Sequence, residues 1–268
     1  MNESVIMALA ATLGTWAVTA LGAATVIFFR KPDPGALNLM LGFSAGVMVS
    51  ASFWSLLQPA IERAGQVCRM PAGVVATAGF MCGALFMWVS DRIVSWSRGR
   101  AEGGRGGPDQ RIGRIVMLVL SITLHNIPEG LAVGVAFGIL EPHWSMEELM
   151  GAVTVAVGIG LQNFPEGAAV SIPLRREGCS AMKSFLAGQA SGMVEPLAGV
   201  VGALLVVYVE ALLPFALSFA AGAMILVAVH ELIPECQRNQ KTKPYSATMG
   251  IIMGFAVMML MDVMLGRS

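Results

Sequence analysis

The chain has 268 residues, a mean hydropathy of +0.71 and only 13% charged residues. Soluble domains carry about 25% charged residues, so this chain has roughly half of the usual charge. Because 17 Lys and Arg residues balance 17 Asp and Glu residues, no net field attracts a polyanion, which argues against a nucleic-acid partner. Eight membrane helices of about 20 residues each would leave no room for a sizeable soluble domain.

Eight apolar runs follow one another along the chain, and each is long enough to cross a bilayer as a helix. The sequence therefore predicts an all-α integral membrane protein with a single transmembrane domain, 1–268. An Arg- and Gly-rich stretch at about 97–112 is expected to be a loop, and Pro59 is expected to end the second helix. The predicted helices are 5–29, 36–57, 72–94, 113–140, 149–174, 184–208, 212–233 and 245–265.

The basic residues indicate the orientation of these helices. Of the 17 Lys and Arg residues, 14 lie in alternate connections, on one side of the predicted membrane. The positive-inside rule places that side, with the 97–112 loop, in the cytoplasm. Because the number of helices is even, both termini are predicted to be extracytoplasmic.

Two segments occur twice in the chain. Phe-Ser-Ala-Gly-Val-Met at 43–48 matches Phe-Ala-Ala-Gly-Ala-Met at 219–224, and Asn-Ile-Pro-Glu-Gly at 126–130 matches Asn-Phe-Pro-Glu-Gly at 163–167. In the predicted orientation, the two members of each pair cross the membrane in opposite directions. Inverted repeats of this kind are typical of secondary transporters, whose substrate site lies between the repeats near the bilayer midplane.

Three glutamates lie near the centres of predicted helices: Glu129, Glu166 and Glu195. A charged group at this depth costs about 2.5–3.5 kcal/mol on insertion scales, so a function is the default interpretation. His125 lies four residues before Glu129, which places both side chains on one helix face. Gln162 holds the matching place before Glu166.

The prolines of the repeated motif add a further property. Pro128 and Pro165 each free a backbone carbonyl, which is tolerated at membrane depth only inside protein or beside a cavity. Carboxylates, free carbonyls, amides and one imidazole together favour a divalent transition ion such as zinc or ferrous iron. Met48, in the second predicted helix, is either a thioether ligand or a packing residue.

Other interpretations remain open at this point. The glutamates could instead cycle protons in a cation/proton exchanger, or serve an intramembrane metalloenzyme, for which no nucleophile is evident. His230 and Glu231 begin an incomplete HExxH motif, so a zinc-protease helix is excluded, and a metal exit or a plain helix end remains. Asp91, near the end of a predicted helix, is expected at the membrane interface.

Four motifs carry a resemblance to a known family: His-Asn-Ile-Pro-Glu-Gly at 125–130, Gln-Asn-Phe-Pro-Glu-Gly at 162–167, Glu195–Pro196 and His230–Glu231. The chain resembles the ZIP (Zrt/Irt-like) divalent-metal transporters, especially their prokaryotic GufA-like branch. The resemblance implies a 3+2+3 arrangement, in which the first three and last three helices are inverted repeats. It also implies a homodimer in the bacterial inner membrane that imports zinc by an elevator-like motion. Iron, manganese, cobalt and cadmium are implied as related substrates, with no prosthetic group and no enzymatic activity.

The resemblance also implies roles for individual residues. Two of these roles are a cytoplasmic-side release position at His230 and Glu231 and a second metal site adjacent to the first. The transport-site ligands would be Met48, His125, Glu129, Gln162 and Glu166, and the second site would add Asn126, Asn163 and Glu195. Members of the branch often carry aspartate where this chain has Asn163, so the second metal should bind more weakly here.

Overall fold

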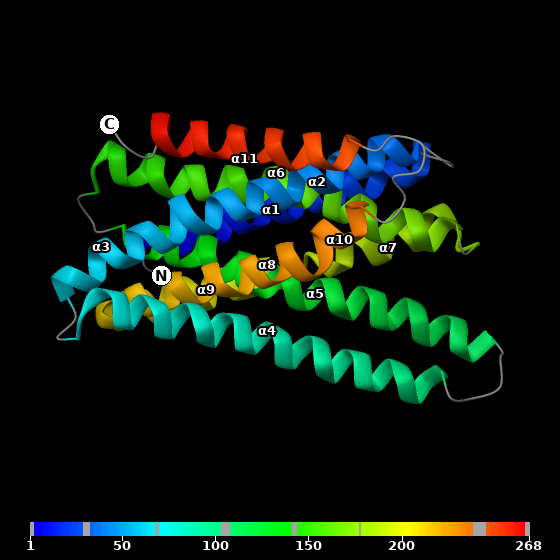
Figure 1. The fold of residues 1–268 in the computed structure, drawn as a ribbon, viewed down its shortest axis with the longest axis horizontal. Helices are drawn as coiled ribbons and strands as arrows, with labels where there is room; N and C mark the ends of the chain where they lie inside the picture. The colour runs from blue at the N-terminus through cyan, green and yellow to red at the C-terminus, as the bar shows by residue number, and fades with distance from the viewer. Residues whose placement is uncertain are drawn as a thin grey trace.

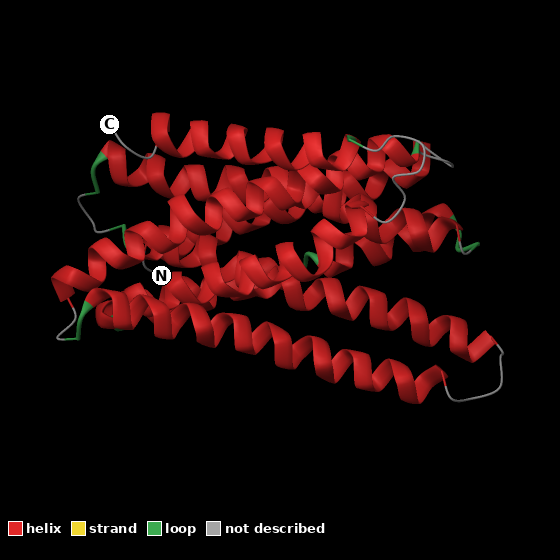
Figure 2. Cartoon of the chain, in the orientation of Figure 1, coloured by secondary structure: helices red, strands yellow, loops and turns green. Residues whose placement is uncertain are grey.

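The structure is a computed structural model, and it describes residues 3–28, 33–67, 70–102, 108–140, 144–176, 178–237 and 245–265. Over these ranges all regular secondary structure is helical and no strand occurs (Figures 1 and 2). The all-α prediction is therefore confirmed.

The described helices join into eight long rods, one for each predicted apolar run (Figure 1). Two rods extend well past the predicted ends, to Val67 instead of 57 and to Glu102 instead of 94. Three of the rods contain short π-helical or 3₁₀ segments or a break. In chain order the elements are α1 (Glu3–Phe28), α2 (Pro34–Ala51), η1 (Ser52–Leu57), α3 (Gln58–Val67), α4 (Ala72–Glu102), α5 (Pro108–Gly138), α6 (Met146–Arg176), α7 (Ala181–Ser191), α8 (Val194–Tyr208), η2 (Glu210–Leu212), α9 (Leu213–Val227), η3 (Ala228–Leu232), α10 (Ile233–Gln237) and α11 (Ser246–Leu265).

Six of the rods are long and apolar enough to cross a membrane: those of α1, α2–α3, α4, α7–α8, α9–α10 and α11. The two others, α5 and α6, carry the repeated Asn-x-Pro-Glu-Gly motif. The start of α1 and the end of α11 lie at the same end of the molecule (Figure 1), as an even number of antiparallel rods requires.

Pro59 does not end the second rod, so that prediction was wrong. The π-helical turn η1 precedes Pro59, and the backbone N–H of Gln58 donates to the carbonyl of Phe53. A π turn accommodates one extra residue, and α3 then begins at Gln58, with Pro59 as its second residue. The second π turn, η3, likewise ends just before Pro234.

The predicted loop at 97–112 is mostly helical. Helix α4 continues to Glu102 and α5 begins at Pro108, and 103–107 lie outside the described residues. The reason is that hydropathy marks where a chain leaves the bilayer, whereas Arg, Ala and Glu are good helix formers in water. The apolar run therefore ended before the helix did.

The rods pack in two groups. Helices α1, α5, α6, α7 and α8 contact one another and form what we call the bundle. Around them, α2 packs along α11 and α4 packs along α9. These two pairs, with η1, α3, η3 and α10, form what we call the frame.

Backbones in the frame approach so closely that only glycine fits. A Cβ at Gly254 of α11 would overlap the carbonyl oxygen of Phe43 in α2, and a Cβ at Gly83 of α4 would overlap that of Phe219 in α9. Small residues allow such close packing in membrane helices, where van der Waals contact replaces the hydrophobic effect as the driving force. Each pair of the frame is therefore held by direct backbone contact.

Candidate metal-binding site

Three helices of the bundle bring the three predicted glutamates into its interior. Glu129 of α5, Glu166 of α6 and Glu195 of α8 are 1%, 6% and 0% exposed, respectively. They lie close enough to one another to interact electrostatically. Buried charges are normally paired with an opposite charge or bound to a metal. The described hydrogen bonds to these three carboxyl groups come from uncharged side chains, including Thr15, Ser44 and Gln162. When ionised, these three carboxyl groups would supply the negative charge that a bound cation requires.

The two copies of the repeated motif face each other through Glu129 and Gln162. The amide nitrogen of Gln162 in α6 donates to Oε1 of Glu129 in α5. Oε2 of Glu129 has no hydrogen-bond partner, although it is fully buried. Three further buried oxygens from the same two motifs also lack a partner: Oδ1 of Asn126, Oε1 of Gln162 and Oδ1 of Asn163. Because buried polar atoms are normally satisfied, four such acceptors in two adjacent motifs suit a bound cation.

Glu195 lies between α1 and α6 and is surrounded by hydrogen-bond donors. Thr15 Oγ1 donates to Glu195 Oε2 over 2.5 Å, and Asn163 Nδ2 lies 2.9 Å from both carboxylate oxygens. Thr19 Oγ1 adds a longer contact of 3.4 Å to Oε1. Both oxygens of Glu195 therefore already accept hydrogen bonds from the protein itself.

The sixth rod is broken between α7 and α8, two residues before Glu195. Carbonyls freed at a helix end need partners, and two bundle side chains provide them. Asn126 Nδ2 donates to the carbonyl of Ser191 over 2.9 Å, and Trp16 Nε1 donates to that of Gln189 over 2.8 Å. Since the amide nitrogen of Asn126 is held in this way, its Oδ1 is the atom left for a ligand.

Glu166 is contacted from outside the bundle. Ser44 Oγ, on α2 of the frame, lies 3.0 Å from Glu166 Oε1 and 3.2 Å from the carbonyl of Gln162. Met48 lies one helical turn beyond Ser44, on the same side of α2. It is 1% exposed and belongs to the main apolar core.

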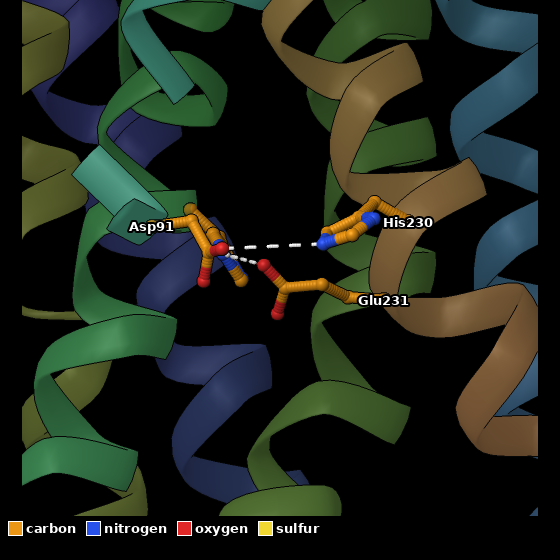
Figure 3. A network of polar contacts seen from close by, with 4 residues as sticks. Asp91, His230 and Glu231 are labelled. Atoms are coloured by element: carbon orange, nitrogen blue, oxygen red, sulfur yellow. Dashed lines mark ion pairs between the residues drawn. The ribbon is translucent and has the colours of Figure 1, made fainter. Parts of the chain in front are cut away.

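His125, His230 and Glu231 meet at the junction of α5 with η3. Nε2 of His125 lies 2.8 Å from Oε1 of Glu231, an ion-pair distance without the geometry of a hydrogen bond. Nε2 of His230 lies 3.9 Å from Oδ2 of Asp91 on α4, and Figure 3 shows this contact beside Glu231. Of the two predicted exit residues, Glu231 therefore contacts His125 and its neighbour His230 contacts Asp91 on α4.

Two polar cavities lie at opposite ends of α9. The larger, which we call the His125 cavity, has a volume of about 720 Å³. Its ionisable lining residues are Asp91, His125, Glu166, His230, Glu231 and Glu235. The smaller, the Glu147 cavity, has a volume of about 330 Å³ and is lined by Glu62, Glu147, Glu148 and Asp262, among others. Its lining includes none of the ten predicted ligands, whereas the His125 cavity is lined by four of them: His125, Glu166, His230 and Glu231.

The predicted ligands do not form one compact cluster of ionisable groups. Within the described part of the chain, no three His, Cys, Asp or Glu side chains are close enough together to hold a metal ion. His125 is with Glu231, Glu166 with Ser44, and Glu195 with Asn163 and Thr15. A metal ion bound here would therefore need oxygens from Glu129 and from the amide side chains of Asn126, Gln162 or Asn163 as ligands.

Three residues at the site were missed by the sequence analysis: Ser44, Thr15 and Asp91. For Thr15 a signal existed, because Thr12, Thr15 and Thr19 recur at helical spacing and are all buried. Ser44 gave no signal beyond its place in the 43–48 repeat. Asp91 was expected at the interface, and its place in the lining of the cavity that contains His125 was not foreseen.

The long apolar helices define the class as a multi-pass helical membrane protein, and its interior contains buried carboxyl groups and partnerless oxygens. Comparison with known proteins identifies the family. Residues 106–262 match the model of the ZIP zinc transporters. Human "Zinc transporter ZIP11" is 39% identical, with 99% of each chain covered. "Zinc transporter GufA" of Myxococcus xanthus is 35% identical over 96% of this chain and 98% of its own. "Zinc transporter ZIPB" of Bordetella bronchiseptica is 37% identical over 94% and 79%.

The chain therefore belongs to the ZIP zinc transporter family. Members of this family are transporters and not enzymes, so the metalloenzyme alternative is set aside. GufA is among the relatives, which agrees with the resemblance drawn from the motifs.

Proposed function

We propose that this protein imports zinc into the cytosol through a metal site formed by His125, Glu129, Gln162 and Glu166. The observation that carries the proposal is the pair of buried, partnerless oxygens of Glu129 and Gln162, beside the buried carboxylate of Glu166. One imidazole with carboxylate and amide oxygens suits zinc and related divalent transition ions. Iron, manganese, cobalt and cadmium are therefore candidate substrates as well. Met48, one turn from Ser44, is proposed to approach the ion as a thioether ligand.

We propose a path that starts at the Glu147 cavity and ends at the His125 cavity. The acidic lining of the Glu147 cavity suits the capture of cations on the extracytoplasmic side. The basic residues concentrate at the opposite end of the rods, which the positive-inside rule assigns to the cytoplasm. His230, Glu231 and Asp91 line the route to that end and are proposed to receive the released ion.

The membrane fold that we propose has eight spanning helices in a 3+2+3 arrangement, with extracytoplasmic termini. Support for inverted repeats comes from the frame, because Gly254 meets Phe43 and Gly83 meets Phe219. Phe43 and Phe219 are the first residues of the repeated 43–48 and 219–224 segments, so equivalent residues make equivalent contacts. The π turns η1 and η3 both begin nine residues after these phenylalanines.

An elevator-like motion is proposed on the division between bundle and frame. Direct backbone contacts lock α2 to α11 and α4 to α9. The carboxylates belong to the bundle, whereas Ser44, Met48, His230 and Glu231 belong to the frame. Movement of the bundle along the frame would carry the ligands from one cavity toward the other.

The second metal position is proposed to stay unused in this chain. Asn163 and Thr15 donate to both oxygens of Glu195, so that carboxylate serves to tie α1, α6 and α8 together. Asn126 and Asn163 would offer a second metal ion only uncharged amide oxygens, which attract a cation less strongly than carboxylate oxygens. One divalent ion is then carried at a time.

The protein is proposed to function as a homodimer in the bacterial inner membrane. Helices α4 and α11 expose large apolar side chains, including Met81, Leu85, Ile252 and Leu260, each more than half exposed. Such faces suit contact with lipid or with a second copy.

The test is zinc uptake by cells or proteoliposomes that contain the protein. Glu166→Ala should abolish uptake while the amount of protein in the membrane stays normal, because the site loses one of its carboxylates. Glu3→Gln, which removes an exposed carboxylate at the start of α1, is the matched control and should transport normally. Unchanged uptake by Glu166→Ala would refute the assignment. Uptake that requires an opposing proton gradient would favour the exchanger instead.

A further inference from the structure

Ser44 is a fully buried serine that touches a predicted metal ligand from another group of helices. It is 0% exposed, and its hydroxyl lies 3.0 Å from Oε1 of Glu166. Ser44 lies on α2 of the frame, whereas Glu166 lies on α6 of the bundle. The contact therefore crosses the boundary along which we propose that the bundle moves.

The chain contains an internal comparison for Ser44. The residue at the equivalent place in the 219–224 repeat is Ala220, which is also buried, at 1% exposed. A methyl side chain therefore satisfies the packing of this helix position in α9. The hydroxyl of Ser44 is not needed for packing, and its contact with Glu166 calls for another explanation.

A carboxylate can bind a metal ion through one oxygen or through both. The Ser44 hydroxyl lies within hydrogen-bond distance of both Oε1 of Glu166 and the carbonyl of Gln162. When it donates to Oε1, that oxygen has one lone pair fewer for an ion, and Oε2 becomes the favoured ligand atom. This arrangement occurs in a structure whose His125 cavity reaches Glu166. A ligand limited to one oxygen holds its ion less firmly, which favours escape into the cavity.

From this geometry we propose that Ser44 is a positioning residue, which restricts Glu166 to one-oxygen binding while the His125 cavity is open and so promotes release of the metal. The inference rests on the proposed function. When the bundle moves along the frame, Ser44 and Glu166 separate because they belong to different groups. Both oxygens of Glu166 then become available, and the ion is held more tightly on the side of entry.

The pair His125–Glu231 follows the same pattern. His125 belongs to the bundle and Glu231 to the frame, and their side chains lie 2.8 Å apart. Glu231 therefore competes with the metal for the imidazole, as Ser44 competes for Glu166. Two bundle ligands are contacted by frame residues in the arrangement that is open to the His125 cavity.

The test is zinc transport by the full-length protein in proteoliposomes. Ser44→Ala should lower both KM and Vmax for zinc, each by about three- to tenfold, because the ion binds more tightly and leaves more slowly. Release of zinc from purified protein to a chelator should slow by a similar factor. Ser44→Thr keeps the hydroxyl and should keep KM and Vmax near those of the wild type, although its added methyl group enters a fully buried position and should lower Tm. The control is Ser171→Ala, which removes a buried hydroxyl that contacts only the carbonyl of Ala168 in its own helix.

The outcomes separate this inference from the proposed function. If Ser44→Ala leaves both KM and Vmax within twofold of the wild type, or raises KM, the release role of Ser44 is refuted. If Ser44→Ala does not fold, Ser44→Cys, with its weak S–H donor, should give a smaller shift in the same direction, and no shift refutes the role. If the wild type itself transports no zinc, the proposed function fails and the role of Ser44 fails with it.

Discussion

Replacing Asn163 by aspartate tests how this chain handles the second metal position. Asn163 Nδ2 lies 2.9 Å from both oxygens of Glu195, and the change puts a carboxylate oxygen in place of that donor. A hydrogen bond to a charged group contributes about 1.5–3 kcal/mol. Two unit charges 4 Å apart repel by about 4 kcal/mol at an effective dielectric constant of 20. A shared proton relieves most of that repulsion, so the net loss of stability without metal should be about 3 kcal/mol.

Thermal unfolding of purified protein, with and without zinc, measures this loss. For a chain of this size, 1 kcal/mol shifts Tm by about 2–4 °C, so Asn163→Asp without metal should melt about 6–12 °C below the wild type. Zinc should raise the Tm of the variant more than that of the wild type, because the added carboxylate creates a second site. Bound zinc should rise from one ion per chain to two.

Asn163→Ala is the matched control, since it removes the donor without adding charge. It should lose about 1.5–3 kcal/mol of stability and bind a single zinc ion. If Asn163→Asp and the wild type have the same Tm in the absence of metal, the contact between Asn163 and Glu195 does not contribute about 1.5–3 kcal/mol. If the wild type already binds two ions, the idea of an unused second position is wrong.

Two further predictions concern the frame and the exit. Gly254→Ala should destabilise the protein by more than 2 kcal/mol, because its Cβ would overlap the carbonyl of Phe43 and force α2 away from α11. Gly14→Ala has open space around it and should be neutral or slightly stabilising, and equal melting temperatures for the two variants would contradict the backbone contact. Asp91→Asn should leave Tm within about 2 °C of the wild type, because the pair with His230 is 3.9 Å long and half exposed and such pairs contribute little. Asp91→Asn should lower the Vmax of zinc uptake, because release of zinc becomes slower. An unchanged Vmax would show that Asp91 does not take part in release.

The positions of the helices could be predicted because apolar length is a strong signal. Each of the eight apolar runs lies in one rod. The ends could not be predicted as well, since hydropathy does not register a helix that continues into water, as α4 does to Glu102. Pro59 was also misread, because a π turn before a proline leaves no mark in composition.

The pairing of side chains was harder to foresee than their presence. The spacing of His125 and Glu129 correctly indicated one helix face, yet His125 contacts Glu231, more than a hundred residues away. Glu195 stood out as a buried charge, but its partner Thr15 is an ordinary membrane-helix residue with no charge to reveal it. Tertiary packing decides which donor reaches which carboxylate. The paired residues are more than a hundred positions apart, so local sequence patterns do not predict the pairing.

The size of the His125 cavity bears on hydration. Its volume of about 720 Å³ is many times the roughly 10–15 Å³ that one water molecule needs in a cavity. An ion that leaves the proposed ligands His125 and Glu166 would therefore regain its water shell in this cavity, which would offset the cost of its dehydration. The Glu147 cavity does not reach the ligands, so an arriving ion must lose water before it binds. Magnesium gives up water reluctantly. The need to lose water before binding would therefore select against magnesium, whatever the ligands of the site prefer.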